Sequence, residues 1–339
     1  METTLPNISK PSVLVTGGAG YIGSHAVLAL KDAGWDVAVI DNLTTGFRFA
    51  VPEGVPLYEG DIGDSALLAR IFAQHRTGAV MHFAGSIVVP ESVEDPLKYY
   101  RNNTANSRVL IEAAVEAGVP HFIFSSTAAT YGIPETSPVK EDAAQRPINP
   151  YGWSKLMTEQ MLADTAKAHA LNYCALRYFN VAGADPKARS GQSTAGATHL
   201  IKVAVEAALG KRECVHVFGT DYSTPDGTGV RDYIHVSDLA EAHVQALEAL
   251  IAKPDRSLTM NCGYGRGFSV LEVLDAVDRV TNLRLDRRIE GRRAGDPDQL
   301  ISDPSRIRST LPWQPKHADL DTIIAHALAW ERKLSELRG

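Results

Sequence analysis

The sequence predicts an α/β fold: a doubly wound parallel sheet with a smaller C-terminal lobe interleaved with it. The first half of the chain repeats a short β-branched run followed by a longer amphipathic stretch, which is typical of parallel strands joined by crossover helices. A glycine-rich turn follows the first run, and from Asn180 onwards the composition shifts to Gly, Ala and Ser. With 339 residues, 44% of them hydrophobic, the chain can bury the large core that this fold needs.

The elements of the first sheet follow from these runs in chain order. The β-branched runs predict strands at Val13–Thr16, Asp36–Ile40, Pro56–Tyr58, Ala79–Phe83, His121–Ser126 and Asn172–Tyr178. The amphipathic stretches predict helices at Tyr21–Ala33, Ser65–Gln74, Leu97–Ala117 and Tyr151–Ala170. This alternation is that of a Rossmann fold, which binds its ligands beyond the carboxyl ends of the strands.

The second lobe is expected to be smaller and looser. After the Gly/Ala/Ser-rich segment a helix runs to Leu209, and Gly, Pro, Asp and Thr crowd the loop Gly219–Gly229. Val230–Val236 is predicted as a strand and Ser237–Ile251 as a helix capped by Ser237. We expect this strand and helix to return to the first sheet.

The last predicted helix, about Leu320–Leu334, carries one apolar stripe. Its members are Ile323, Ala327, Trp330 and Leu334, and we expect them in the core rather than around a cofactor. Because the chain has neither an internal repeat nor a low-complexity linker, the two lobes are expected to pack as one unit with a cleft between them.

Charge and composition exclude several classes of protein. A net charge of −6 without a basic stripe argues against nucleic acid and anionic membranes as partners. The sequence has no apolar run long enough to span a bilayer, and residues 1–10 lack the apolar core of a signal peptide, so we expect a cytoplasmic protein. Cys174, Cys214 and Cys262 are expected to be reduced, and no metal site is predicted.

The glycine-rich turn predicts a dinucleotide site. Gly17, Gly20 and Gly23 lie between a predicted strand and a predicted helix, where backbone N–H groups can approach a pyrophosphate. A second strand ends at Asp41, eighteen residues beyond Gly23, where a carboxylate can accept hydrogen bonds from ribose hydroxyls. Because a carboxylate there repels a 2′-phosphate, NAD is favoured over NADP. Asp61–Ile62 and Phe83–Gly85 also follow predicted strands, at the same edge of the sheet.

Tyr151 and Lys155 form the predicted catalytic pair. They lie four residues apart at the start of a predicted helix and therefore share one face. A tyrosine acting as a base near neutral pH needs its pKa lowered from about 10 by roughly three units, about 4 kcal/mol. An ammonium about 4 Å away at an effective dielectric constant of about 20 supplies an attraction of about that size, so one lysine nearly suffices. An oxidised nicotinamide ring nearby adds a second positive charge and favours the phenolate further. Thr127, which follows the strand His121–Ser126, is expected to relay or hold the reacting proton.

The quoted segments together resemble a known family. Thr16–His25, Tyr151–Lys155 and Leu176–Asn180 are similar to motifs of the extended short-chain dehydrogenase/reductase family. Gly227–Val236 and Arg292–Asp296 are most similar to the branch of that family that epimerises UDP-hexoses at C4. The similarity covers about residues 12–335. It implies an NAD-binding Rossmann domain over 12–180 with a return segment at about 230–251, and a UDP-sugar lobe mainly over 181–335.

The resemblance also implies the contacts of each site. For the cofactor it implies Gly17, Gly20, Tyr21, Ile22, Gly23, Asp41, Asn42, Asp61, Ile62, Phe83, Ala84, Gly85, Asn102, Ser125, Tyr151, Lys155 and Tyr178. For the UDP-sugar it implies Thr127, Tyr151, Asn180, His199, Leu200, Phe218, Arg231, Arg293, Asp296 and Leu300. The residue types agree, since two arginines can bind a diphosphate and Phe218 offers a flat face for uracil.

The implied activity interconverts UDP-galactose and UDP-glucose through a transient 4-keto sugar, with Tyr151 as base and acid. Ile87, His199 and Leu300 depart from the family pattern. Leu300 replaces a residue that is bulky in enzymes restricted to the plain hexose and small in those accepting N-acetylated sugars, so N-acetylhexosamine and pentose substrates stay open. The resemblance implies a homodimer through the helices Leu97–Ala117 and Tyr151–Ala170.

Two other functions are weighed against this activity. A sugar-nucleotide 4,6-dehydratase needs an acid–base carboxylate pair after the threonine, where this chain has Ala128, Ala129 and Thr130. A non-catalytic NAD-binding redox sensor would not need the lowered tyrosine pKa that the set Thr127, Tyr151 and Lys155 is predicted to produce.

Overall fold

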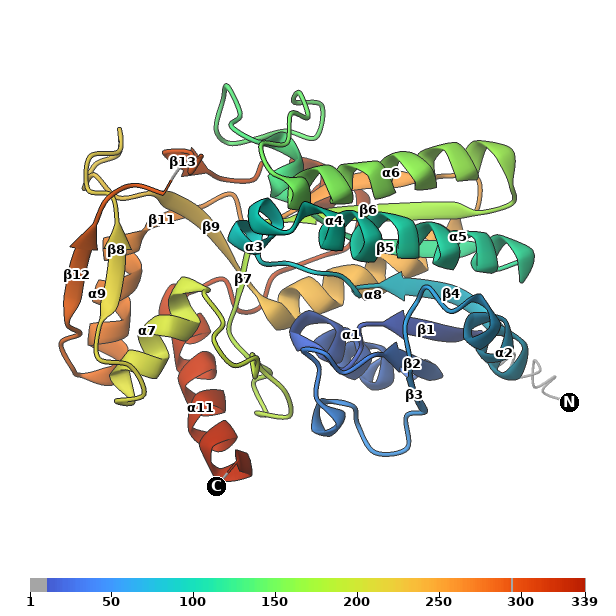
Figure 1. The fold of residues 1–339 in the computed structure, drawn as a ribbon, viewed down its shortest axis with the longest axis horizontal. Coiled ribbons are helices and arrows are strands. Elements are labelled where there is room, and N and C mark those ends of the chain that lie inside the picture. Colours follow the sequence, from blue (N-terminus) through green and yellow to red (C-terminus); the bar gives the residue numbers. More distant parts are fainter. Residues whose placement is uncertain (1–10, 294, 339) are drawn as a thin grey trace, which may run out of the picture.

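A seven-stranded parallel sheet forms the centre of the larger lobe in the computed structural model, which describes residues 11–293 and 295–338 (Figure 1). Its strands, in the order β10-β6-β5-β4-β1-β2-β3, are β10 (Leu258–Cys262), β6 (Asn172–Tyr178), β5 (His121–Thr127), β4 (Thr77–His82), β1 (Ser12–Thr16), β2 (Val37–Asp41) and β3 (Leu57–Glu59). The predicted doubly wound parallel sheet is therefore confirmed. The winding direction reverses between β1 and β4, which opens a crevice beyond their carboxyl ends.

Helices cover both faces of this sheet. One face carries α1 (Tyr21–Asp32) and α8 (Val236–Ala252), and the other carries α2 (Ser65–His75), α5 (Asn106–Glu116) and α6 (Pro150–Ala168). Because side chains alternate along a strand, Val13 and Val15 of β1 pack in the cluster of α1 and α8, whereas Leu14 packs in that of α2 and α5. Both clusters are apolar side chains packed against the sheet, as expected for a parallel sheet covered on both faces.

The smaller lobe has two short sheets. A four-stranded sheet contains β7 (Asn180–Ala182), β9 (Val230–His235), β11 (Gly267–Ser269) and β13 (Gln299–Leu300), and β8 (Val215–Phe218) pairs with β12 (Arg287–Glu290). Its helices are α7 (Leu200–Ala208), α9 (Val270–Thr281), α10 (Ser305–Thr310) and α11 (Leu320–Arg338). Short elements elsewhere are η1 (Arg48–Ala50), α3 (Val89–Glu94), α4 (Pro96–Tyr99), η2 (Tyr100–Ala105) and η3 (Ala128–Tyr131). Figure 1 shows β8 and β12 at the end of the molecule farthest from β3.

The segment expected to return to the first sheet does so only in part. The strand β9 pairs with β7, β11 and β13, so placing it in the first sheet was wrong. Its helix α8 does pack on that sheet, and the following strand β10 completes the sheet by pairing with β6. The sequence of β10, Leu-Thr-Met-Asn-Cys, alternates with polar residues and was not predicted as a buried strand.

Two predicted helices also differ in detail. The helix expected over Leu97–Ala117 is not one regular α-helix, because the π-helical turn η2 separates α4 from α5. The cap expected at Ser237 is wrong, since α8 begins at Val236 and the ring Nδ1 of His235 accepts a hydrogen bond from the Ser237 N–H at 3.0 Å. The apolar stripe of α11 is confirmed as core, with Ile323, Trp330 and Leu334 buried.

The helices of the described residues were also compared with what a bilayer requires. Within residues 11–293 and 295–338, none is both long and apolar enough to cross a membrane.

Candidate active site

The glycine-rich turn joins β1 to α1 in a conformation that only glycine allows. Gly17 has φ +70°, and a Cβ on it would lie 2.6 Å from the backbone nitrogen of Ala84. A Cβ on Gly23 would lie 2.1 Å from the carbonyl oxygen of Gly17. The helix begins after Gly20, and within the described chain no side chain caps its first N–H groups. Those groups are therefore available to an anion such as a pyrophosphate.

Asp41 holds this turn from the neighbouring strand. Its buried carboxylate accepts hydrogen bonds from the N–H groups of Ala19 at 3.0 Å and Leu43 at 2.8 Å. Burial raises the pKa of Asp41, although these two hydrogen bonds oppose the rise. Asn42 donates to Asp61 at 3.3 Å, so the residues predicted to bind adenosine do lie together beyond β2 and β3.

The ends of β1 and β4 are linked by a buried polar chain. Thr16 Oγ1 lies 2.7 Å from His82 Nδ1, and His82 Nε2 lies 2.8 Å from Ser107 Oγ. Burial lowers the pKa of His82 to about 3, with a further decrease from Lys155, so the imidazole is neutral. The carbonyl oxygen of Thr16 accepts from the Phe83 N–H at 3.0 Å, which fixes Phe83–Gly85 beside the glycine-rich turn.

Asn103 is a site residue that the sequence analysis missed. Its side chain accepts from the Ser86 N–H at 2.7 Å and donates to Ser86 O at 2.9 Å and to Ser154 Oγ at 3.0 Å. It thereby ties the loop after β4 to α6, whereas the predicted Asn102 is partly exposed and donates to Ser86 Oγ at 3.1 Å. Two consecutive asparagines inside a predicted helix were the available signal, because asparagine is unfavourable in a helix interior.

The predicted catalytic residues meet between the end of β5 and the start of α6. Asn149 caps α6 by accepting from the Gly152 N–H at 2.8 Å, which places Tyr151 and Lys155 on its first turns, both buried. The hydroxyl of Thr127 hydrogen-bonds Tyr151. Lys155 Nζ donates to the carbonyl oxygen of Ser125 at 3.1 Å and lies 5.0 Å from the centre of the Phe124 ring.

The pKa values of Tyr151 and Lys155 are shifted mainly by burial. Burial raises the pKa of Tyr151 and the hydrogen bond from Thr127 lowers it, so the net shift is upwards. Burial lowers the pKa of Lys155 to about 8, and Glu159 opposes this decrease. Lys155 was expected to come near to supplying the decrease in the pKa of Tyr151, with an oxidised nicotinamide adding to it; without the cofactor, the pKa is raised. Lys155 Nζ is held against the Ser125 carbonyl, and burial of the phenol is the largest cause of the raised pKa of Tyr151.

A buried ion pair supports this arrangement from behind. Arg177 Nη2 lies 2.6 Å from Glu159 Oε2, with both side chains less than 10% exposed. Arg177 also donates to the hydroxyl of Tyr131 at 3.0 Å, and Ser126 donates to Glu159. The network connects β5, β6 and α6, and therefore fixes the helix that carries Tyr151. The predicted cofactor contacts Ser125 and Tyr178 hydrogen-bond each other at the same edge.

The residues predicted to hold the nucleotide gather at the outer edge of the smaller lobe, and we call Phe218, Arg231, Arg293 and Asp296 the nucleotide rim. The guanidinium of Arg293 lies 3.8 Å from the centre of the Phe218 ring. Arg231 Nη2 lies 3.7 Å from Asp296 Oδ1. Arg293 and Asp296 are exposed, so this group is much more open than the catalytic residues. The ring face that was expected to meet uracil is covered by Arg293.

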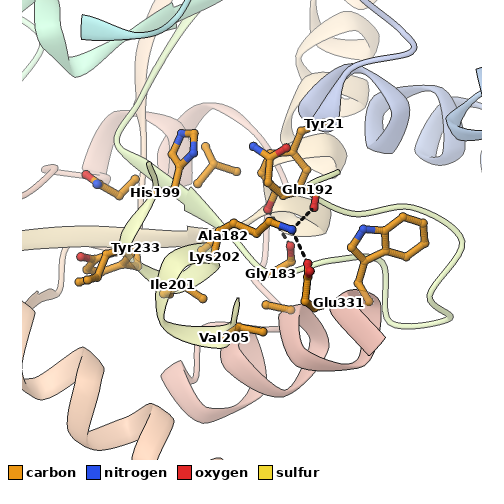
Figure 2. A pocket seen from close by; sticks show the side chains of 15 residues that line it. Tyr21, Ala182, Gly183, Gln192, His199, Ile201, Lys202, Val205, Tyr233 and Glu331 are labelled. Carbon is orange, nitrogen blue, oxygen red and sulfur yellow. Dashed lines mark hydrogen bonds and ion pairs between the residues drawn. The ribbon is translucent and has the colours of Figure 1, made fainter. Parts of the chain in front are cut away.

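A pocket between the lobes brings predicted residues of both sites together. Figure 2 shows Tyr21 from the glycine-rich turn facing the same pocket as His199, and Asn180 and Leu200 also line it. The Tyr21 hydroxyl donates to the carbonyl oxygen of Gly183 at 2.7 Å, which links α1 to the smaller lobe.

The remaining predicted positions are less central to the site. Leu300 is half-buried and packs against Ala128, Tyr131 and Val139. Ile62 is buried in the core, and Ile87 is half-exposed. Across the part of the chain that the structure describes, no three His, Cys, Asp or Glu side chains are placed to hold a metal ion.

Comparison with known sequences places this geometry in context. Residues 13–263 match the profile of the NAD dependent epimerase/dehydratase family. The chain is 59% identical over 331 residues to a UDP-glucose 4-epimerase of Azospirillum brasilense, an alignment that covers 98% of this chain and 95% of that protein.

Two solved structures of UDP-glucose 4-epimerases are similar to this chain over nearly its whole length. The structure of UDP-glucose 4-epimerase from Brucella ovis in complex with NAD is 46% identical, with a TM-score of 0.91 over 94% of this chain and 98% of that one. The structure of UDP-glucose 4-epimerase from Stenotrophomonas maltophila with bound NAD and formylated UDP-arabinopyranose is 39% identical, with a TM-score of 0.93 over 97% of this chain and 100% of that one.

Proposed function

The chain belongs to the NAD dependent epimerase/dehydratase family, and from that premise we propose that it is an NAD-dependent isomerase that interconverts UDP-galactose and UDP-glucose at C4. The observation that carries the proposal is the meeting of Thr127, Tyr151 and Lys155 beside the glycine-rich turn. This is where the crevice of a doubly wound sheet opens.

The residues at this edge fit NAD as the cofactor. The uncapped start of α1 can receive the pyrophosphate, and glycine is needed at Gly17 and Gly23 because any side chain would collide with backbone. Asp41 offers a carboxylate to the ribose hydroxyls, which disfavours a 2′-phosphate. When bound, oxidised NAD supplies the hydride acceptor for the sugar carbon and a positive charge on its ring.

Two protein side chains carry out the proton transfer at the C4 hydroxyl. Tyr151 accepts the proton of the C4 hydroxyl and returns it after the sugar has turned over, while Thr127 holds the phenol by a hydrogen bond. Burial raises the pKa of Tyr151. The positive charges of Lys155 and of the oxidised cofactor would both favour the phenolate.

The nucleotide rim holds the UDP portion and leaves the hexose free to rotate. Arg231 and Arg293 offer charge-assisted hydrogen bonds to the diphosphate, and they lie on a different lobe from Tyr151. Inversion at C4 requires the ring to present both faces to one hydride donor, so tight binding of the sugar itself would oppose the reaction.

The substitution Tyr151→Phe tests the proposal. Purified wild-type enzyme is expected to interconvert UDP-galactose and UDP-glucose without added reductant, measured by separating the two sugars. Because removing a general acid–base group costs about 10²–10⁴-fold, the variant should lose that much in kcat while still binding NAD. If the wild type leaves both sugars unchanged, or releases a stable keto sugar, the proposal is wrong.

The oligomeric state and the location belong to the same proposal. We propose a homodimer through the face of α4 and α6, because Leu97 is 77% exposed and Trp153 and Met157 are each 41% exposed there. Light scattering of the wild type and of Leu97→Glu tests the interface.

A cytoplasmic location is supported by three free cysteines.

A further inference from the structure

Three side chains on the β8–β12 pair form a chain of contacts outside the site described above. Cys214 Sγ lies 3.5 Å from His216 Nε2, and His216 Nδ1 lies 2.9 Å from Glu290 Oε1. Cys214 directly precedes β8, His216 is its second residue, and Glu290 ends β12. The pair lies at the end of the molecule away from α5 and α6 (Figure 1).

The order of these contacts determines what the imidazole can do. A carboxylate accepts hydrogen bonds, so Glu290 selects the tautomer of His216 with its proton on Nδ1. Nε2 then presents a lone pair towards the thiol of Cys214. A nucleophile, a base and a group that orients the base are the three parts needed to activate a thiol.

The other two cysteines lack this environment. Cys174 and Cys262 are completely buried on β6 and β10, and burial raises the pKa of both thiols. Cys214 lies at the edge of its lobe with 8% of its surface exposed, beside an imidazole whose side chain is 48% exposed. The guanidinium of Arg288, paired first with Glu213, also lies near this thiol.

We propose that Cys214 is a modification site: a thiol activated by His216 and Glu290 that forms a mixed disulfide with low-molecular-weight disulfides. The thiol proton passes to His216 Nε2, and the sulfur attacks one sulfur of the disulfide. The disulfide bond breaks, and its second half leaves as a thiol after taking the proton back from the imidazole. Cys214 is oxidised and the leaving half of the reagent is reduced.

The modification is connected to the nucleotide rim through the backbone. Glu290 lies opposite Phe218 in the register of β12 and β8, and Arg293 follows it by three residues. A group attached to Cys214 displaces His216 and Glu290, and therefore disturbs the strand ends that hold Phe218. Resting on the proposed function, this predicts a higher KM for the UDP-sugar with little change in kcat.

The test uses native full-length enzyme and the aromatic disulfide dithiobis(nitrobenzoate), whose released thiolate is coloured. One thiol is expected to react rapidly, and peptide mass spectrometry should locate the label on Cys214. Cys174 and Cys262 should react only after unfolding. Cys214→Ser should remove the rapid phase. Slow or absent native labelling of Cys214 overturns the proposal, whatever the enzyme does with sugars.

Two carboxylate variants separate activation by His216 from a simple effect of charge. Glu290→Gln removes the partner of His216, and Glu213→Gln removes a carboxylate that pairs with Arg288. If local charge alone governs the thiol, both variants react faster, because each loses a negative charge. If His216 acts as the base, Glu290→Gln and His216→Asn react about tenfold more slowly or worse, and Glu213→Gln does not. Equal rates in Glu290→Gln and the wild type contradict the proposal.

Discussion

The cofactor edge of the first sheet and the nucleotide rim of the smaller lobe are built in opposite ways. At the cofactor edge, glycines leave no room for a Cβ, and the catalytic helix is fixed by a buried ion pair. At the rim Arg293 and Asp296 are exposed, and the less exposed Arg231 lies 3.7 Å from Asp296. A cofactor that stays bound needs a rigid cradle, whereas a substrate that must enter, rotate and leave needs side chains that move. The difference therefore agrees with the proposed function.

The largest expected effect compares the buried ion pair behind the catalytic helix with an exposed ion pair next to the rim. Glu159→Ala leaves Arg177 buried without its partner, which should lower the free energy of unfolding by about 3–5 kcal/mol. Asp221→Ala removes one partner of Arg292, whose side chain is 39% exposed, and should change the free energy of unfolding far less. Denaturant unfolding of both variants measures the difference. Equal losses would show that the two regions are equally rigid.

A pair of glycine substitutions sharpens the same comparison. Gly23→Ala places a methyl group 2.1 Å from a backbone oxygen, whereas Gly291→Ala, next to the rim, meets nothing within 4 Å. We expect Gly23→Ala to cost about 1–3 kcal/mol and to reduce the NAD content of the purified enzyme. Gly291→Ala should match the wild type in stability and cofactor content. Full NAD content in Gly23→Ala would refute the assignment of the turn.

The sequence predicted the parts of the molecule whose signals are local. The glycine-rich turn, the strand ends and the Tyr151–Lys155 spacing each occupy a few consecutive residues, and the structure brings them to one edge. The family and the parallel sheet are confirmed, whereas the roles of the individual site residues stay predictions. The cofactor edge was accessible to sequence reasoning because one short segment determines its geometry.

What the sequence did not predict depends on contacts between distant residues. Asn103 matters because its amide reaches Ser86 and Ser154, up to 51 residues away. The strand β10 is recognisable only by its pairing with β6, since its own alternation is that of a half-exposed strand. The raised pKa of Tyr151 follows from burial that no four-residue spacing reveals.

Acid should weaken the cofactor half before the rim. In the cofactor half, burial lowers the pKa of His25 and His243 to about 4 and of His82 to about 3, all below the value of 6.5 in an unfolded chain. The unfolded state therefore binds more protons below pH 6.5, and stability present above that pH is lost as the pH falls towards 4. Below pH 6.5, each histidine contributes up to about 1.4 kcal/mol per pH unit to the slope of the free energy of unfolding against pH.

The variant His243→Phe isolates one of these contributions. Its ring lies 4.8 Å from that of Phe83, and within the described residues its Nε2 has no hydrogen-bond partner. Between pH 7 and pH 5 the free energy of unfolding of the wild type should fall by about 2 kcal/mol more than that of this variant. An unchanged slope in His243→Phe would contradict the buried neutral assignment.

The smallest expected effect on stability comes from the rim itself. Arg293→Ala removes a guanidinium stacked 3.8 Å from the Phe218 ring, and an exposed contact of this kind contributes about 0.5–1 kcal/mol. The free energy of unfolding should therefore fall by no more than about 0.5–1 kcal/mol. The KM for UDP-galactose should rise, because the diphosphate loses a charge-assisted hydrogen bond. Arg293→Lys keeps the charge but not the planar fork, so it should restore stability more fully than KM. If Arg293→Ala instead lowers stability as much as Glu159→Ala, the rim is a structural element, and the mobility required for the sugar to rotate must lie elsewhere.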